Sequence, residues 1–334
     1  MKMHLAVAVL VLAHFPACAQ DWVTVGGNEG RTGLVDFELG QALFRPAWAL
    51  DGNGERSSEP VTIVGDQIFV VPRRDLDSRH SVRSFSLSDG TLLWEREYPS
   101  IYLASQPTYF DGNLYFLTTD RRDFSHLRAL DATTGETRWE HRFSNHRGSP
   151  TSVIANDSGL WLNGGSSEGI YRFSLGGLEE LFVPRPLDYE YTPTQTGGQL
   201  FTWVDETFEA HDPVTGEGQW SLPISNGAPG LGRPVDYPVV TDAEALMIDR
   251  GGTLVCVDLN NREVRWRSDQ NLAGGTNLSF RGLPAVGENQ VFAIARDRVV
   301  AFDLTTGEVV KTYPMIEVID SRQPLLLRDH FIVG

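Results

Sequence analysis

The sequence is poor in cysteine and has no long apolar run beyond its N-terminus. Only two cysteines occur among 334 residues, and Cys18 lies within a predicted export signal. The remaining Cys256 has no intramolecular partner for a disulfide, and its alternating neighbourhood, residues 253–257, predicts a buried strand residue. No segment after residue 20 is apolar over the length that a membrane-spanning helix requires. The sequence therefore excludes a disulfide-built fold and predicts no transmembrane segment.

Basic residues and enzyme motifs are scarce as well. The 28 Lys and Arg residues face 44 Asp and Glu residues, which gives a net charge of −16 and a pI of about 4.9. Such an acidic surface repels phosphate backbones, so we expect no nucleic-acid partner. The eight histidines show no metal-ligand spacing, and no Gly-x-Ser-x-Gly, P-loop or His-Glu-x-x-His motif occurs. We predict no metal site, no catalytic residue and no enzymatic activity.

The N-terminus has the features of an export signal. Lys2 precedes an apolar run over residues 5–13, and Pro16 is followed by the small-x-small sequence Ala17-Cys18-Ala19. We therefore predict a signal peptide over residues 1–19 and a periplasmic or secreted protein. Cys18 offers an alternative, in which the chain is lipid-anchored through this residue. A lead-in segment over residues 20–40 and one large domain over residues 41–334 follow.

A repeat of about 45 residues fills that domain. Its pattern is Ala/Val-x-Asp-x-x-x-Gly-x-x-x-Trp, as at Asp131, Gly135 and Trp139. The positions equivalent to Asp131 are residues 86, 131, 174, 212, 258 and 303, with spacings of 45, 43, 38, 46 and 45. Phe182 and Lys311 replace the Trp in two copies. The tryptophans in register are Trp48, Trp94, Trp139, Trp220 and Trp266.

Proline provides a second marker of the same period. Seven prolines recur at spacings of 40–47 residues, each before a short apolar or Thr-rich stretch, and proline is tolerated as the first residue of a strand. They are Pro60, Pro107, Pro150, Pro193, Pro238, Pro284 and Pro324. Within residues 107–141, Asp-Gly and Thr-Gly turns separate four strand-like segments. The sequence thus predicts an all-β propeller of seven four-stranded antiparallel blades, with eight as the alternative.

The segment at residues 131–139, Asp-Ala-Thr-Thr-Gly-Glu-Thr-Arg-Trp, resembles the repeat of the PQQ-like (quinoprotein-type) β-propeller family. That family includes quinoprotein alcohol dehydrogenases and the BamB-like lipoproteins of outer-membrane assembly, and the chain resembles the latter more. The resemblance implies that the repeat Trp docks between neighbouring blades and that the Gly allows a tight turn. Blades ending in Phe182 and Lys311 are expected to dock less well.

The sequence does not determine which segment completes the last blade and closes the propeller. Propellers avoid a free edge by pairing an N-terminal strand with the last blade. Trp48 is expected to share that blade with residues 325–327 and 330–333, which leaves one strand missing. Residues 22–25 alternate in polarity and could supply it. Alternatively, the chain is a fragment and the last blade is incomplete.

Two groups of residues are candidates for binding. The first surrounds one mouth of the central channel, where residues that precede the prolines gather: Glu59, Gln106, Ser149, Thr192, Tyr237, Leu283 and Gln323, with Arg322 beside them. The second is a pair of matching loops, Arg73-Arg74 in blade one and Arg121-Arg122 in blade two, with Arg250, Arg296 and Arg298 in comparable hairpins. Arginine forks suit carboxylates. The alternative is that both groups are solvated or internally paired.

We therefore predict a monomeric, non-catalytic scaffold that binds an envelope or extracellular protein, or a small polar ligand, on one loop face. A PQQ-dependent dehydrogenase is one alternative. The resemblance implies adjacent cysteines and long insertions for such an enzyme, and this chain has neither, so no PQQ with calcium is expected. A glycan- or polymer-binding module is the other alternative. It would use exposed aromatic residues such as Trp161 or Trp203, which lie in apparent strands and are expected in the core.

Overall fold

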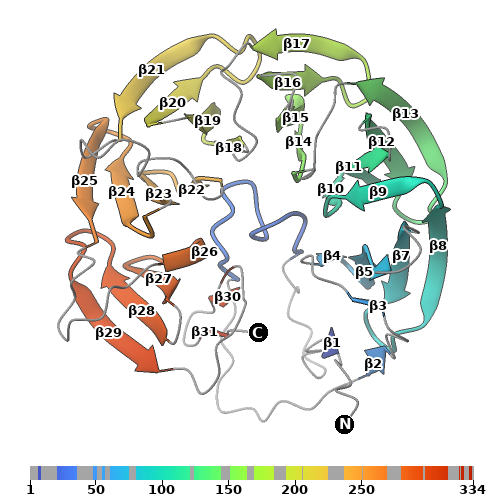
Figure 1. Ribbon diagram of the computed structural model, residues 1–334, viewed down its shortest axis with the longest axis horizontal. Coiled ribbons are helices and arrows are strands. Elements are labelled where there is room, and N and C mark those ends of the chain that lie inside the picture. Colours follow the sequence, from blue (N-terminus) through green and yellow to red (C-terminus); the bar gives the residue numbers. More distant parts are fainter. Residues whose placement is uncertain are drawn as a thin grey trace. The chain divides into compact units, whose positions relative to one another are not determined.

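The described part of the computed structural model is built from β-strands (Figure 1). It comprises residues 7–8, 21–35, 48–50, 55–56, 61–74, 80–120, 124–143, 151–163, 169–183, 193–204, 206–224, 237–249, 251–268, 280–295, 298–314, 323, 325–326 and 331–332. In these ranges no helix is long and apolar enough to cross a membrane. The all-β class predicted from the repeat is confirmed.

Six antiparallel sheets each contain four strands that are paired in sequence order, and we call each sheet a blade. Blade one contains β4 (Thr62–Val64), β5 (Gln67–Val70), β7 (His80–Ser86) and β8 (Leu92–Tyr98). Blade two contains β10 (Thr108–Phe110), β11 (Asn113–Asp120), β12 (Ser125–Asp131) and β13 (Thr137–Phe143). Blade three contains β14 (Ile154–Asn156), β15 (Gly159–Asn163), β16 (Ile170–Phe173) and β17 (Glu179–Val183).

The remaining three blades follow the same order. Blade four contains β18 (Thr194–Thr196), β19 (Gln199–Val204), β20 (Thr207–His211) and β21 (Gly218–Pro223). Blade five contains β22 (Val239–Val240), β23 (Glu244–Ile248), β24 (Leu254–Asp258) and β25 (Glu263–Arg267). Blade six contains β26 (Phe280–Val286), β27 (Gln290–Ala295), β28 (Arg298–Asp303) and β29 (Val309–Pro314).

Seven further short strands lie outside this pattern. Blade one is extended by β3 (Glu55–Arg56) and β6 (Arg73–Arg74), and blade two by β9 (Ile101–Ala104). The strand β1 (Val7–Ala8) pairs with β2 (Ala49–Leu50), and β30 (Leu325–Leu326) pairs with β31 (Phe331–Ile332). How the last blade closes, and the count of seven, remain predictions.

The chain divides into two compact units. Unit 1 consists of residues 1–25, 41–167 and 171–180, and unit 2 of residues 26–40, 168–170 and 181–334. In unit 1 the first strands β4, β10 and β14 lie side by side, and in unit 2 the first strands β18, β22 and β26 do so (Figure 1). The predicted boundaries at residues 19 and 40 remain predictions.

Apolar clusters fill the space between blades one and two, between blades two and three, and between blades four and five. Trp161 in β15 and Trp203 in β19 are almost wholly buried, as their strand positions predicted. Neither is therefore available to stack on a sugar. Cys256 in β24 is also buried, and burial raises the pKa of its thiol to about 12. Such a thiol stays protonated at neutral pH, which agrees with a structural role.

The repeat Asp organises the turn between the third and fourth strands. Asp131 Oδ1 accepts the backbone N–H groups of Thr133 (2.9 Å) and Thr134 (2.8 Å). The same bonds recur at Asp212, Asp258 and Asp303. Amide hydrogen bonds of this kind stabilise the charged carboxylate, and those from the turn hold the pKa of Asp131 below its usual value.

The repeat Trp contacts the Gly of the following blade. Trp94 Nε1 donates to Ala132 O (3.0 Å), and its ring covers Gly135, where a Cβ atom would lie 2.5 Å from the ring. Gly135 also has a φ of +71°, so both its conformation and its lack of a side chain are needed. Three other pairs share this arrangement: Trp48 with Gly90, Trp139 with Gly177, and Trp266 with Gly307.

Three positions of the repeat depart from that arrangement. Gly216 in blade four faces Leu181 and Val183, because Phe182 stands where the repeat has Trp. In blade five Arg262 replaces the Gly, with a φ of +56°, and its guanidinium carbon lies 5.7 Å from the centre of the Trp220 ring. In blade six Lys311 replaces the Trp, and its Nζ lies 4.7 Å from the Tyr313 ring centre.

The sequence left open whether residues 22–25 supply the missing strand of the last blade, and the structure places Trp22 and Val23 against other strands. Trp22 forms a bridge with Ile63, with N–O distances of 2.7 and 2.9 Å, and Val23 O accepts the N–H of Tyr109 at 2.8 Å. The segment thus lies against the first strands of blades one and two. Alternating polarity identifies a segment that can pair at an edge, but it does not say which edge.

Candidate functional site

The lead-in residues 26–33 form a tight loop in unit 2, which we call the Arg31 loop. Gly33 N donates to Gly26 O (2.9 Å), and Arg31 N donates to Asn28 O (3.0 Å). Gly26 has a φ of +78°, and a Cβ atom there would lie 2.6 Å from the Arg31 Cα. The glycines of this segment therefore allow the backbone to fold onto itself around Arg31.

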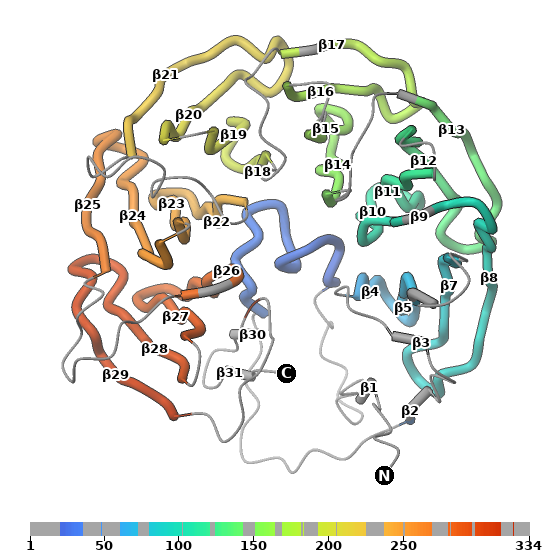
Figure 2. The backbone as a smooth tube through the Cα atoms, viewed as in Figure 1, coloured from blue at the N-terminus to red at the C-terminus, as the bar shows by residue number. Residues whose placement is uncertain are grey.

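The loop binds the first strands of unit 2 through its backbone (Figure 2). Val240 N, in β22, donates to Gly30 O, and Val286 N, at the end of β26, donates to Thr32 O, both at 2.8 Å. Arg31 is 1% exposed, and its Nη2 lies 3.4 Å from Pro193 O. The loop therefore occupies the side of unit 2 on which these first strands lie.

Two of the predicted ligand-binding residues meet at Arg31. The Tyr237 ring centre lies 4.1 Å from the guanidinium carbon, which is the geometry of a cation–π contact. Gln323 Nε2 donates to Arg31 O (2.8 Å) and to Pro284 O (3.0 Å). The third, Arg322, lies outside the described residues. Tyr237 and Gln323 thus have intramolecular tasks, and ligand binding by them remains a prediction.

Among the other residues of the predicted channel mouth, some are buried in the described structure and the rest lie outside it. Gln106 is buried, and its Nε2 donates to Val61 O (3.0 Å) and Thr62 Oγ1 (3.2 Å) in blade one. Leu283 is buried as well. Three further members lie outside the described residues: Glu59, Ser149 and Thr192. Gln106 and Gln323 thus hydrogen-bond to backbone or side-chain groups at neighbouring first strands.

The arginine pair of blade one lies on an added strand. Arg73 and Arg74 form β6, in which Arg73 is registered with Arg56 and His80, and Arg74 with Glu55. The strand β3 comes from the linker that precedes blade one. It extends the hairpin between β5 and β7 and places three arginines on two short paired strands.

The hairpin of blade two is extended by a linker strand as well. There, β9 pairs with the end of β11, where Thr118 faces Ala104 and Thr119 faces Leu103. Arg121 and Arg122 follow β11 and lie outside the described residues. The hairpin is closed at its base by hydrogen bonds between Asp120 and Phe124 at 2.9 and 3.0 Å.

A network of charged and aromatic side chains supports this second hairpin. Arg128 is 9% exposed, forms an ion pair with Glu140, and donates from Nε to Thr118 Oγ1 (2.9 Å). Its guanidinium carbon lies 4.6 Å from the Tyr98 ring centre, and burial raises the pKa of Tyr98. At the surface, the Arg142 guanidinium carbon lies 3.5 Å from the ring centre of Phe124, which is 38% exposed.

The described residues do not provide a donor set for calcium or another metal ion. In this part of the chain no three His, Cys, Asp or Glu side chains lie close enough together to bind one ion. Glu244 and Asp258 come near each other, but both bind Arg265, at 2.9 and 2.5 Å. Their charge is already compensated by that guanidinium. The absence of PQQ and calcium therefore remains a prediction.

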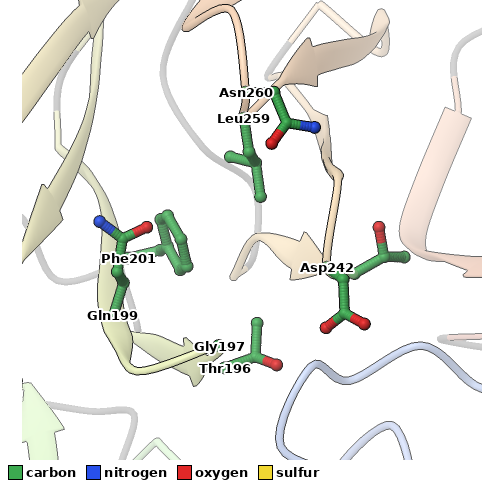
Figure 3. Close-up of a pocket in the computed structure, with 8 residues that line it drawn as sticks. Thr196, Gly197, Gln199, Phe201, Asp242, Leu259 and Asn260 are labelled. Carbon is green, nitrogen blue, oxygen red and sulfur yellow. The ribbon is translucent and has the colours of Figure 1, made fainter.

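A small cavity opens between blades four and five in unit 2 (Figure 3). Its volume is about 100 Å³, which is room for about three water molecules. Sites for drug-sized ligands and cofactors are several times larger. It is lined by Thr196, Gly197, Gln199, Phe201, Thr241, Asp242, Leu259 and Asn260. The sequence predicted no site here, because no motif marks these turns.

Comparison with solved structures places the fold among PQQ-type propellers. BamB from Moraxella catarrhalis is 14% identical, with a TM-score of 0.63 over 86% of this chain and 82% of that one. A europium-containing methanol dehydrogenase is 11% identical, with a TM-score of 0.67 over 92% and 80%. The quinohemoprotein alcohol dehydrogenase of Comamonas testosteroni is 12% identical, with a TM-score of 0.61 over 91% and 74%. At these identities the likeness concerns the fold alone.

Comparison of the sequence with known proteins identifies the family. The serine/threonine-protein kinase AfsK of Streptomyces griseus is 26% identical over 158 residues, which are 46% of this chain and 20% of the kinase. The chain thus matches about a fifth of that relative. A family model described as outer membrane protein assembly factor BamB matches residues 39–181 and 78–334. The chain is therefore an all-β propeller protein and belongs to the PQQ-like family of BamB.

Proposed function

We propose that this chain is a non-catalytic scaffold of the cell envelope, periplasmic or secreted, that binds an acidic protein partner. The binding surface consists of the two arginine hairpins, Arg73-Arg74 in blade one and Arg121-Arg122 in blade two. One observation carries the proposal: within the described residues, the two hairpins with paired arginines are the two that are extended by a linker strand, β3 or β9. Blades three to six have four strands each in the described part.

The added strands give these hairpins a defined edge. A hairpin that protrudes from a blade is mobile unless its backbone groups are paired, and β3 and β9 supply that pairing. The strands β7 and β9 lie next to each other, so the two extended hairpins belong to neighbouring blades of unit 1. Arginines on adjoining hairpins present planar guanidinium groups that bind carboxylates in a bidentate manner.

The negative net charge of the chain would confine an acidic partner to the arginine hairpins. With a net charge of −16, most of the surface repels an acidic partner. We propose that the paired arginines attract and orient it, and Phe124 with Arg142, at the base of the hairpin of blade two, adds an exposed aromatic and cationic contact. Aromatic residues and arginine are the side chains that contribute most often to protein interfaces.

The test is capture of partners by wild type and by a fourfold variant, Arg73→Ser, Arg74→Ser, Arg121→Ser and Arg122→Ser. The control variant carries Arg296→Ser and Arg298→Ser in the hairpin of blade six. Proteins captured from an envelope extract are quantified at 50 and 300 mM salt, and binding of a ten-residue polyglutamate peptide is measured by fluorescence anisotropy. We expect the fourfold variant to lose at least tenfold in both assays, with an unchanged melting temperature. Equal loss in the control, or no salt dependence, would contradict the proposal.

We also propose that the chain does not bind PQQ with calcium. Cys256 is the one cysteine that follows the predicted signal, and the carboxylates near it are bound to Arg265. Calorimetric titration of the protein with PQQ and calcium, followed by a dye-linked assay of alcohol oxidation, tests this. Micromolar binding together with alcohol oxidation would replace the scaffold proposal with that of a dehydrogenase.

A further inference from the structure

The junction between blades four and five has an altered tryptophan contact. Trp48, Trp94, Trp139 and Trp266 each donate from Nε1 to a carbonyl in the next blade, at 2.8–3.0 Å. In the described structure, Trp220 makes no such bond. Its ring faces the Arg262 side chain instead of a glycine, and Arg262 keeps the positive φ that the glycine would have.

A second contact is altered at the same junction. In blade one, Gln67 begins β5, and its Nε2 lies 3.5 Å from Ala132 O in the turn of blade two. Gln199 occupies the same place at the start of β19, but its amide bonds to Gln219 within blade four. The turn of blade five, at Leu259, therefore receives neither of the two contacts that Ala132 receives. The cavity opens where those contacts would be.

The lining of the cavity combines an apolar floor with a polar rim. The Phe201 ring is 2% exposed and is held by stacking on Phe208, with 5.6 Å between ring centres. Thr196, Asp242 and Asn260 line the other sides of the cavity and come from three turns of unit 2 (Figure 3). An aromatic face beside hydrogen-bond acceptors is the arrangement that binds ammonium groups.

The charges around the cavity have the sign that such a ligand needs. Asp242 is exposed at the rim and forms no ion pair in the described structure. Behind it, Glu244 and Asp258 share the single guanidinium of Arg265. The Arg265 hydrogen bond lowers the pKa of Asp258 to about 2, so that carboxylate is charged at neutral pH. Arg262, whose guanidinium carbon lies 5.7 Å from the Trp220 ring centre, forms no ion pair with a carboxylate of the described residues.

From the altered junction, the cavity and its charge, we propose that this site binds an alkylammonium group. The group is either the head of a small free amine or the side chain of a lysine on a partner protein. Asp242 pairs with the nitrogen, Phe201 and Leu259 contact the alkyl carbons, and Thr196 and Asn260 accept the remaining N–H groups. The cavity volume limits the bound group to about five heavy atoms. The site is independent of the arginine hairpins and lies in the other unit.

The test titrates the full chain, labelled with ¹⁵N, with n-butylammonium and with Nα-acetyl-lysine methylamide at low salt. The readout is the chemical shift of the Gly197 amide. 1-Butanol serves as the neutral ligand of equal size. The variants are Asp242→Asn and, as control, Asp157→Asn, which changes an exposed aspartate in the corresponding turn between β14 and β15.

We expect saturable shifts at Gly197 with a Kd of about 1 mM for butylammonium, and none for 1-butanol. Asp242→Asn should weaken binding at least fivefold, and Asp157→Asn should leave it unchanged. Binding of both cations assigns the site to lysine side chains, whereas binding of butylammonium alone assigns it to free amines. Equal binding of 1-butanol, equal weakening by both variants, or shifts that do not include Gly197 would overturn the proposal.

Discussion

The junction at Trp94 and the junction at Trp220 use the same repeat residue in different ways. Trp94 covers Gly135 closely and donates to the carbonyl of Ala132, so its ring packs directly on the turn of the next blade. Trp220 faces the long side chain of Arg262, and a cavity of about 100 Å³ lies at the same junction. The comparison shows that the glycine acts on the preceding blade as well as on its own turn. Replacing it changes how two blades meet.

The two units differ in a second respect. In unit 1 the linkers before blades one and two form β3 and β9, which extend the hairpins that carry the paired arginines. The Arg31 loop gives unit 2 a different addition, a buried arginine that is held by Tyr237 and Gln323. Both additions are made by segments outside the repeat. Variation in such segments gives each unit its own surface on a common scaffold.

The largest expected effect comes from removing a tryptophan at each kind of junction. Trp266 is 8% exposed and makes the Nε1 bond, so Trp266→Ala should lower the free energy of unfolding by about 3–5 kcal/mol. Trp220 is less buried and lacks the bond, so Trp220→Ala should cost about 2 kcal/mol. Urea unfolding followed by fluorescence measures both. Equal losses would show that the two junctions do not differ in strength.

The second-largest difference in stability between the two junctions is expected when the residue opposite the tryptophan is changed. Gly307 has a φ of +73°, and a Cβ atom there would lie 2.5 Å from the Trp266 ring. Gly307→Ala should therefore cost about 2–4 kcal/mol. Arg262→Gly removes a strained φ at the cost of chain entropy, so its effect should stay within about 1 kcal/mol. A large loss from Arg262→Gly would show that the arginine has replaced the glycine as a structural contact.

A smaller change in the free energy of unfolding is expected when the pH is lowered and Asp258 becomes protonated. The pKa of Asp258 is lowered to about 2, chiefly by its hydrogen bond to Arg265. Its contribution is complete above the unfolded value of about 3.9 and is lost as the pH falls toward 2. Because Arg265 is partly exposed, we expect about 1–2 kcal/mol. Asp258→Asn should lower stability at pH 7 and flatten its decline between pH 4 and 2. An unchanged decline in the variant would contradict this assignment.

Much of the blade structure could be predicted from the sequence because the repeat encodes local structure. The turns at Asp131 and Asp212, the buried strand around Cys256 and the register of the tryptophans follow from short-range patterns. The pairing of Trp22 with Ile63 and the bond between Val23 and Tyr109 could not be predicted, because many edges accept an alternating segment. The same reason explains why β3 and β9 were missed.

The candidate sites were predicted less well than the fold. Tyr237 and Gln323 were predicted as ligand-binding residues, which stays a prediction, and their common intramolecular partner Arg31 was missed. The cavity beside Phe201 could not be found from the sequence. It is lined by residues of three separate turns, and none of these turns contains a ligand-binding motif.

A double-mutant cycle tests most directly whether the tryptophan of one blade and the residue opposite it in the next act as a pair. The free energy of unfolding is measured for Trp266→Ala, Gly307→Ala and the double variant, and for Trp220→Ala, Arg262→Gly and their double variant. We expect a coupling energy of about 1–3 kcal/mol at Trp266 and Gly307, and less than about 0.5 kcal/mol at Trp220 and Arg262. Additive losses at Trp266 and Gly307, or equal coupling at both junctions, would contradict the account.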